Sequence, residues 1–261
     1  MNPSDPSVLV TEVGHTMVVT INRPESLNSS NAVVATGIGE ALEAAERDDS
    51  IRAVVLTGSG DRAFCAGADV KAAAKGEPLY APGHADWGFA GFARHPIGKP
   101  TIAAINGFAL GGGAELVLAS DLAVMAETAR FGLPEVRLGL IPAAGGAIRL
   151  PRHIPRKLAL ELLLTGDPID AGRCFELGLV NRVVARARVL DAALELAERI
   201  ALGGPRAVRA AKLVGTATAE EDELWALNDK IQEGIRGSDE MREGLLSFVE
   251  KRPPAWRGTD G

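Results

Sequence analysis

Two glutamates, Glu115 and Glu135, stand beside glycine-rich segments where a carboxylate could act on a bound molecule. Glu115 ends the run Gly111-Gly112-Gly113-Ala114-Glu115, and Glu135 follows Pro134, a residue type favoured at the first position of a helix. Either glutamate alone has a structural explanation, because the helix dipole favours acidic residues in a first turn. The two glutamates considered jointly, each beside an apolar segment, predict a pair in which one acts as an acid and the other as a base. This prediction requires that the fold places them close to each other.

The glycines predict a second chemistry, performed by backbone amides. Gly111-Gly112-Gly113 precedes a helical pattern over 114–120, and the unpaired N–H groups at a helix start form an anion site. A second segment, Phe64-Cys65-Ala66-Gly67-Ala68-Asp69, offers further amides. Two amides from separate loops that meet at one oxygen make an oxyanion hole. Tight packing of a helix against a strand remains the alternative explanation for these glycines, whereas the spacing of a dinucleotide-binding loop is absent.

Other catalytic chemistries find little support in the sequence. No serine has the G-x-S-x-G surroundings of a nucleophile elbow, and Cys65 has no neighbouring cation to depress its pKa. The histidines are scattered without the spacing of a metal pair, at positions 15, 84, 95 and 153. We therefore expect no metal site.

The composition is that of one large globular domain, or of one domain with an appendage. The chain has 261 residues, of which 46% are hydrophobic, and a formal net charge of −6. This charge gives no support to broad binding of nucleic acid or of an anionic membrane. Two cysteines, no signal peptide at the N-terminus and no uninterrupted apolar span predict a cytoplasmic protein.

Apolar runs and helical periodicity alternate along the first two thirds of the chain. Strands are predicted over 8–12, 17–21, 53–57, 101–105, 122–125 and 179–184, and a helix over 31–48. This alternation predicts an α/β domain with largely parallel strands. After about residue 185 only helices are expected, over 189–201, 205–214, 219–236 and 238–251. We divide the chain into a core over 1–200 and a helical C-terminal region over 201–261.

One long irregular segment, Lys71–Pro100, interrupts this pattern. It contains Tyr80, Trp87, Phe89 and Phe92 in a chain with only 4% aromatic residues. Loops of this length are usually functional or disordered. The clustered aromatics favour a lid or a pocket wall.

In their order and spacing, the segments 64–69, 107–115 and 134–146 resemble the crotonase (enoyl-CoA hydratase/isomerase) superfamily. The resemblance covers nearly the whole chain, from Asn22-Arg23-Pro24 to Phe248-Val249-Glu250-Lys251-Arg252. It implies an α/β fold in which ββα units repeat in a spiral and carry a helical C-terminal extension. It also implies homotrimers, or hexamers made of two trimers, that assemble through the C-terminal region.

The resemblance assigns the site residue by residue. The amides of Ala68 and Gly112 would hold a thioester oxygen, and Glu115 and Glu135 fall on the two catalytic glutamates of the hydratase branch. The segment with Ala66, Gly67, Asp69 and Val70 resembles the adenine-side pocket of coenzyme A. Phe248 and Lys251 resemble positions that reach the nucleotide of a neighbouring subunit.

The implied activity is that of an enoyl-CoA hydratase of fatty acid metabolism, which adds water to a 2-enoyl-CoA thioester. Glu135 would donate the proton to Cα and Glu115 would orient the water. Coenzyme A enters as part of the substrate, and no metal or redox cofactor is expected. The alternatives are an enoyl-CoA isomerase, a dehydratase of hydroxyacyl-CoA similar to the carnitinyl-CoA enzymes, and a non-catalytic acyl-CoA binding protein.

Two positions depart from common family patterns. Glu25 stands where many members have a Lys or Arg near the phosphates of coenzyme A, and Ala143 replaces a frequent Gly in the turn before Gly146. Together with the aromatic segment 71–100, these departures leave the acyl group open, and a non-standard acyl chain remains a hypothesis.

Overall fold

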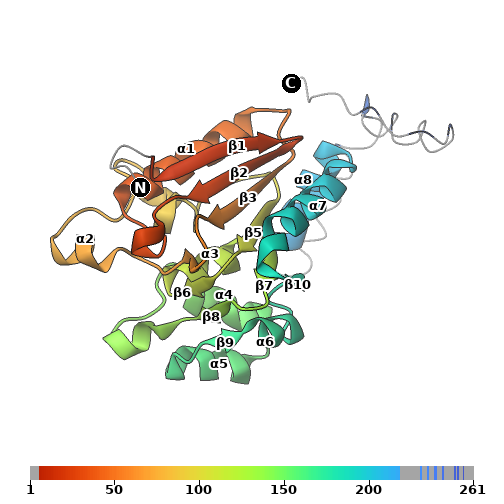
Figure 1. The fold of residues 1–261 in the computed structure, drawn as a ribbon. Helices are drawn as coiled ribbons and strands as arrows, with labels where there is room; N and C mark the ends of the chain where they lie inside the picture. The colour runs from red at the N-terminus through yellow and green to blue at the C-terminus, as the bar shows by residue number, and fades with distance from the viewer. Residues whose placement is uncertain are drawn as a thin grey trace.

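The computed structural model describes residues 6–217 and the single positions 230, 234, 238, 239, 243, 250, 252 and 255. The described strands form two sheets (Figure 1). The larger has the order β1-β2-β3-β5-β7-β10 and is parallel except for the β1–β2 hairpin. The smaller has the order β4-β6-β8-β9, with only β9 antiparallel. The strands are β1 Val8–Val13, β2 Thr16–Ile21, β3 Ala53–Gly58, β4 Ala63–Cys65, β5 Thr101–Ile105, β6 Phe108–Leu110, β7 Leu122–Ala126, β8 Arg130–Gly132, β9 Ile169–Asp170 and β10 Arg182–Val184.

The larger sheet forms from the apolar runs that the sequence analysis identified as strands. Every residue of β3 and β5 is buried, as expected for parallel strands covered on both faces. The strand expected over 179–184 is shorter, because β10 begins only at Arg182. Gly178 turns the chain with a φ of +75°, and Asn181 accepts a hydrogen bond from the amide of Ala123 through its side chain.

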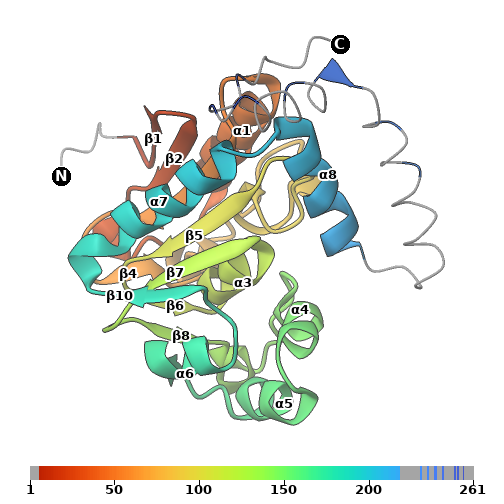
Figure 2. The same ribbon diagram turned by 90° about the vertical axis from the view of Figure 1, so that its right-hand side faces the viewer.

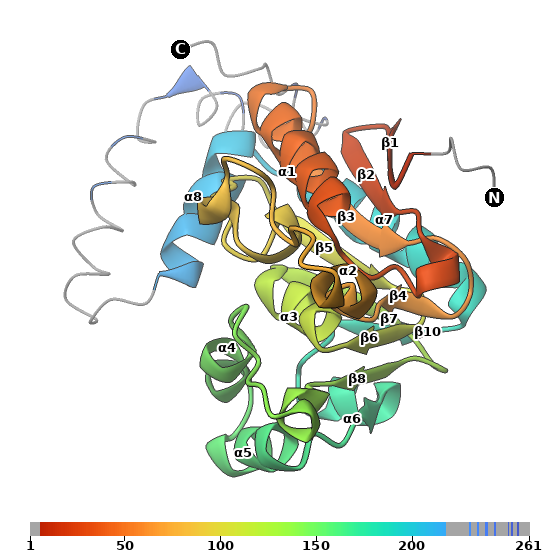
Figure 3. The same cartoon turned by 90° about the vertical axis from the view of Figure 1, so that its left-hand side faces the viewer.

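Helices cover the larger sheet on both faces. Figures 2 and 3 show α7 across one face and α1 across the opposite one. α1 begins after Asn31, whose side chain accepts a hydrogen bond from the amide of Val34 as an N-cap. Within the described chain, no helix has the length and apolarity that crossing a bilayer would require. The helices are α1 Ala32–Arg47, α2 Val70–Ala74, α3 Gly112–Ala119, α4 Gly146–His153, α5 Arg156–Thr165, α6 Ala171–Glu176, α7 Val189–Ala201 and α8 Pro205–Thr216.

The chain repeats one unit, in which a strand of the larger sheet is followed by a strand of the smaller sheet and then by a helix. The order β3-β4-α2, β5-β6-α3 and β7-β8-α4 gives three such units in succession. This arrangement confirms the predicted α/β fold of repeated ββα units.

The C-terminal region is described only in part. α7 and α8 confirm the helices expected over 189–201 and 205–214. The helices expected over 219–236 and 238–251 fall almost entirely outside the described residues, as do Phe248 and Lys251. The division at residue 200 therefore stays a prediction, and so does the oligomerisation role of the region beyond it.

The segment 71–100 is anchored to the core by its aromatic side chains. Trp87 is buried against Ala35 of α1 and Ala81. Phe89 and Phe92 join the main hydrophobic core, whereas Tyr80 is 51% exposed. Three of the four aromatics thus fix the path of the segment, and Phe89 also reaches the candidate site.

Candidate functional site

The smaller sheet brings three loops of the sequence to one edge. β4, β6 and β8 are parallel neighbours, so their carboxyl ends lie side by side. The loop after β4 contains Ala68, the loop after β6 leads through Gly112 into α3, and the loop after β8 leads to Glu135. Ligands bind preferentially at such strand ends. Each of the first two loops follows a short strand of the smaller sheet, β4 or β6, rather than the longer strand that comes before it in the chain, β3 or β5.

The two amides expected to bind an oxyanion lie on loops that touch. Gly67 has a φ of +95°, and a methyl group at its Cβ position would lie only 3.1 Å from the backbone nitrogen of Gly112. The chain needs glycine here both for its conformation and for the close approach. Within the described residues, neither the N–H of Ala68 nor that of Gly112 donates a hydrogen bond to the protein. Both donors therefore remain available to a ligand oxygen.

Glu115 is buried and held by a backbone amide. Its side chain lies in the first turn of α3, and the residue is only 3% exposed. Its Oε1 accepts a hydrogen bond of 2.8 Å from the N–H of Gly146. Burial raises the pKa of Glu115 above its ordinary value, while the amides of Gly146 and Ala144 oppose that rise by stabilising the charged form.

Glu135 lies near Glu115 but has fewer partners. It follows Pro134 in the 3-10 helix Pro134–Leu138, and its Oε1 lies 3.4 Å from the position that a Cβ on Gly111 would take. Its Oε2 is buried without a hydrogen-bond partner among the described residues. Burial, with a contribution from the charge of Glu115, raises the pKa of Glu135 to about 7. The fold thus brings the two glutamates together and gives them different environments.

The raised pKa of Glu135 predicts a pH-dependent stability. The folded state binds this proton more tightly than the unfolded state, where the pKa is near 4.5. The wild type therefore loses free energy of unfolding as the pH rises from about 4.5 through about 7, relative to Glu135→Gln. We expect chemical denaturation to show a larger advantage for Glu135→Gln at about pH 8 than at about pH 4. An equal difference at both pH values would contradict the burial of this carboxyl group.

Arg149 is part of the site, although no sequence pattern indicated it. Its Nη1 donates to the carbonyl oxygen of Ala144 at 3.1 Å, and its Nη2 donates to that of Ala93 at 2.6 Å. The guanidinium group therefore joins the segment 71–100 to the turn before Gly146. Its positive charge also opposes the rise of the pKa of Glu115. Only the fold reveals this role, because Arg149 and Ala93 are 56 positions apart in the sequence.

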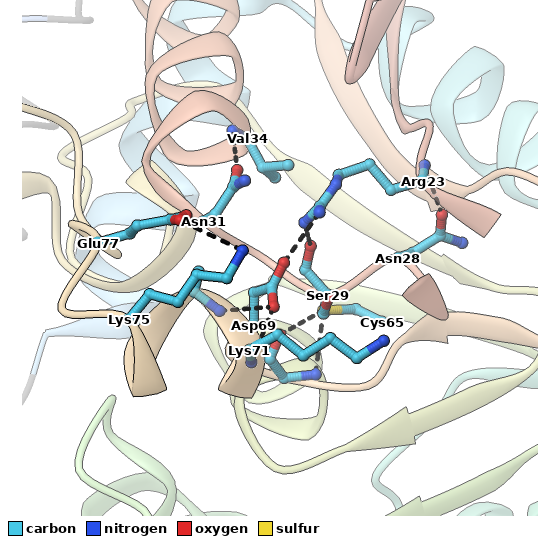
Figure 4. Close-up of polar contacts among 12 residues, drawn as sticks. Arg23, Asn28, Ser29, Asn31, Val34, Cys65, Asp69, Lys71, Lys75 and Glu77 are labelled. Carbon is cyan, nitrogen blue, oxygen red and sulfur yellow. Dashed lines mark hydrogen bonds and ion pairs between the residues drawn. The ribbon is translucent and has the colours of Figure 1, made fainter. Parts of the chain in front are cut away.

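The segment expected to bind coenzyme A includes one of the two amides, that of Ala68, and reaches the surface at Val70. Ala66 and Ala68 are half-buried, Gly67 is buried, and Val70 is exposed at the start of α2. The Asp69 carboxylate is already engaged by Arg23 and by the first amides of α2 (Figure 4). Contact of this segment with coenzyme A stays a prediction. Lys71 is an exposed cation next to it that the sequence analysis did not single out.

The cysteines are unsuited to nucleophilic catalysis. Cys65 and Cys174 are buried, and burial raises the pKa of each thiol to about 12. Both are protonated at neutral pH and pack as small apolar residues. The structure therefore agrees with the expectation that Cys65 is a packed residue rather than a nucleophile.

Comparisons with known proteins agree on one family. The family model described as enoyl-CoA hydratase/isomerase matches residues 12–259. A carnitinyl-CoA dehydratase from Proteus mirabilis (strain HI4320) is 40% identical over 262 residues, which cover 97% of this chain and 98% of that protein. An enoyl-CoA hydratase structure from Mycobacterium tuberculosis H37Rv has a TM-score of 0.93 and 42% identity, over 98% of this chain and 100% of that one. A carnitinyl-CoA hydratase structure from Mycobacterium avium has a TM-score of 0.81 and 46% identity, with the same coverage.

Proposed function

The chain belongs to the enoyl-CoA hydratase/isomerase family, and on that premise we propose that it adds water across the 2,3 double bond of a 2-enoyl-CoA thioester. One observation carries this proposal. Two unpaired amides, the buried Glu115 and the half-buried Glu135 lie at the same edge of the smaller sheet, and the two glutamates have different environments. Hydration of a conjugated thioester needs donors for a developing oxyanion and a pair of groups that take up and deliver protons.

In this mechanism the amides of Ala68 and Gly112 bind the carbonyl oxygen of the thioester. Attack of water at Cβ moves electron density onto that oxygen and forms an enolate-like species. The two N–H groups are oriented before the reaction, so they stabilise the charge without reorganisation. Positive ends of peptide dipoles at the start of α3 add to this stabilisation.

The glutamates move the protons. Glu115 is held by the N–H of Gly146, which favours its charged form, so it orients the water and takes its proton. Glu135, with a pKa of about 7, carries a proton in a large share of the molecules near neutral pH, and this protonated form delivers the proton to Cα. The water oxygen forms the bond to Cβ, and its remaining hydrogen becomes the hydroxyl hydrogen of the product. A proton returned from Glu115 to Glu135 then restores the starting state.

The same residues would run the reverse reaction, and this makes dehydration of a hydroxyacyl-CoA the second candidate. The Proteus mirabilis relative supports it, because that protein is named a carnitinyl-CoA dehydratase. Isomerisation of a 3-enoyl-CoA needs proton transfer but no water, and it remains an alternative within the family. A non-catalytic acyl-CoA binding protein would have no need for two neighbouring carboxyl groups with different environments.

A substrate series tests the proposal. We expect the enzyme to decrease the ultraviolet absorbance of crotonyl-CoA as the conjugated double bond is hydrated. Product analysis after incubation with 3-enoyl-CoA separates isomerisation from hydration, and incubation with carnitinyl-CoA tests dehydration directly. Inactivity toward 2-enoyl thioesters of short, long and branched chains would overturn the hydratase assignment, and release of water from carnitinyl-CoA would replace it with the dehydratase.

The substrate and the assembly complete the proposal. Coenzyme A is part of the substrate, and the reaction as written uses no metal or redox cofactor. We further propose a homotrimer or a dimer of trimers, in which Phe248 and Lys251 reach the nucleotide of a neighbouring subunit. The support for this assembly is the resemblance of the C-terminal region to that of the family.

A further inference from the structure

An ion pair between Arg23 and Asp69 anchors the loop that carries the Ala68 amide. The Nη2 of Arg23 and the Oδ2 of Asp69 are 2.9 Å apart, and the two side chains are only 17% and 12% exposed. Nη1 of the same guanidinium donates a 2.8 Å hydrogen bond to the carbonyl oxygen of Ser29 (Figure 4). Arg23 therefore holds two segments at once, the turn after β2 and the loop after β4.

Asp69 extends this contact into α2. Its Oδ1 accepts hydrogen bonds of 3.1 Å from the amides of Lys71 and Ala72, so it caps the helix. One oxygen thus serves the helix and the other serves Arg23. A carboxylate engaged in this way has little capacity left for a ligand, and its charge would repel the phosphates of coenzyme A.

Backbone hydrogen bonds place Ala68 between these anchors. The N–H of Ser30 donates to the carbonyl oxygen of Gly67, and the N–H of Asp69 donates to that of Ser30, each at 2.8 Å. Ser30 and Ala68 form a parallel bridge. Because successive amides of an extended chain point in opposite directions, this bridge turns the N–H of Ala68 away from Ser30 and leaves it without a partner within the described part of the chain.

We propose that Arg23 and Asp69 are a positioning pair that fixes the direction of the Ala68 N–H toward the thioester oxygen. The pair touches no reacting atom and acts through the loop that it holds. This inference rests on the proposed function, because it assigns the Ala68 amide to the oxyanion. It also changes the expectation for Asp69, whose side chain becomes a support of the oxyanion loop rather than a ligand of coenzyme A.

The charge state of Asp69 fits this role. Burial alone would raise its pKa, but the amide of Ala72 and the Arg23 guanidinium outweigh burial, and the net pKa is lowered. The carboxylate is therefore ionised wherever the enzyme is assayed near neutral pH. The ion pair between Arg23 and Asp69 is therefore formed under the conditions of an activity assay.

The test uses variants that separate the ion pair from the helix cap. Asp69→Asn keeps a good N-cap residue but removes the charge, and Arg23→Met removes the guanidinium while keeping an apolar stem. We expect each to lower kcat about 10- to 100-fold, the scale of a small misplacement of a catalytic group, and to change KM by less than about 3-fold. Arg23→Lys is expected to recover part of kcat. Arg173→Gln, at an exposed ion pair with Glu176, is the matched control.

A spectroscopic readout follows the amide itself. Hydrogen bonds to the carbonyl oxygen of a conjugated 2,4-dienoyl-CoA shift its absorbance to longer wavelength on binding, since they stabilise the charge-separated excited state. We expect the wild type to produce this shift and Asp69→Asn and Arg23→Met to produce a smaller one at saturating ligand. Thermal unfolding checks that each variant is folded. If Arg23→Met does not fold, Asp69→Asn and Arg23→Lys decide the question.

The outcomes separate this inference from the proposed function. Unchanged kcat and an unchanged spectral shift in Asp69→Asn would overturn the positioning role, even if the wild type is an active hydratase. A rise in KM with unchanged kcat would instead make Asp69 a contact of coenzyme A. If the wild type binds the dienoyl thioester with a spectral shift but hydrates no enoyl thioester, the proposed function is overturned. The spectral shifts of the wild type and the variants would then decide whether Arg23 and Asp69 position the Ala68 amide.

Discussion

Replacing Glu135 by Gln should lower the turnover of a 2-enoyl-CoA by about 10²- to 10⁴-fold, the usual contribution of a general acid or base. Glutamine has nearly the same shape but cannot deliver a proton to Cα. Because the buried Oε2 of Glu135 has no hydrogen-bond partner among the described residues, the substitution breaks no contact there. KM should therefore change little. Steady-state kinetics with crotonyl-CoA measure both quantities.

Glu115→Gln should lower the turnover of a 2-enoyl-CoA by a similar factor, but for a different reason. The side-chain oxygen of the introduced glutamine can still accept the hydrogen bond from Gly146, but the neutral group no longer takes a proton from water. The double variant should lose less than the product of the two single losses, since both residues act in one step. Glu127→Gln, at an exposed glutamate, provides the control and should keep the wild-type rate. Full turnover in both active-site variants would reduce these glutamates to helix-start residues.

The pH profile of the wild type gives a second measurement of the same pair. If Glu135 must carry a proton, kcat/KM falls as the pH rises through about 7. If Glu115 must be ionised, kcat/KM also falls on the acid side, near a pKa raised above 4.5. Glu135→Gln should remove the alkaline limb of any residual activity and keep the acid limb.

The larger sheet could be predicted from the sequence because its strands are long apolar runs. β3 and β5 are buried on both faces, and this pattern is visible without the fold. The smaller sheet could not be predicted, because β4, β6 and β8 have only three residues each. Three residues are too few to establish a period of two. Without these short strands, the sequence shows the site loops as simply following β3 and β5, and the edge at which the loops meet stays hidden.

The structure brings together the two glutamates and the glycine-rich loops to which the sequence drew attention, but the partners of these residues could not be predicted. Glycine runs and the glutamates beside them form local patterns, and a resemblance to known sequences adds to these. The contacts of Glu115 with Gly146 and of Arg23 with Asp69 join positions 31 and 46 residues apart, and no local pattern encodes such pairs. Asp69 shows the consequence most clearly. Its position in the coenzyme A segment suggested a ligand, whereas its contacts make it a part of the scaffold.

The sequence alone could not show whether the aromatic residues of the segment 71–100 form a lid or anchor the segment to the core. Clustered aromatics occur in pocket walls, but they also anchor a long loop to a core. Trp87 and Phe92 are buried in this second manner, and Arg149 ties the end of the segment to the turn before Gly146 through Ala93. The second half of the segment, from Trp87 onward, is therefore packed on the core near the site, whereas most of the residues before it are exposed.

The backbone donor at Gly112 can be removed without removing any side chain, and this should cost about 10²- to 10³-fold in kcat. Gly112 is the first residue of α3, a position where proline is well tolerated because its N–H has no helical partner. Gly112→Pro therefore deletes the proposed oxyanion donor and leaves the hydrogen bonds of the helix intact. Loss of the donor acts on the enolate-like state, so kcat should fall more than KM rises.

The control for this substitution is Gly112→Ala, which retains the N–H. A Cβ at this position would lie 2.4 Å from Cε1 of Phe89, so alanine and proline both displace the same ring. The two variants displace that ring alike and differ at the amide itself, where proline has the ring carbon Cδ in place of the hydrogen and so both removes the donor and occupies the space in front of it. A Phe89→Ala background removes the clash and repeats the comparison with more room. Equal turnover of the Pro and Ala variants in both backgrounds would show that the Gly112 amide does not bind the oxyanion, and the glycines of this loop would then serve only the close packing of α3 against the loop after β4.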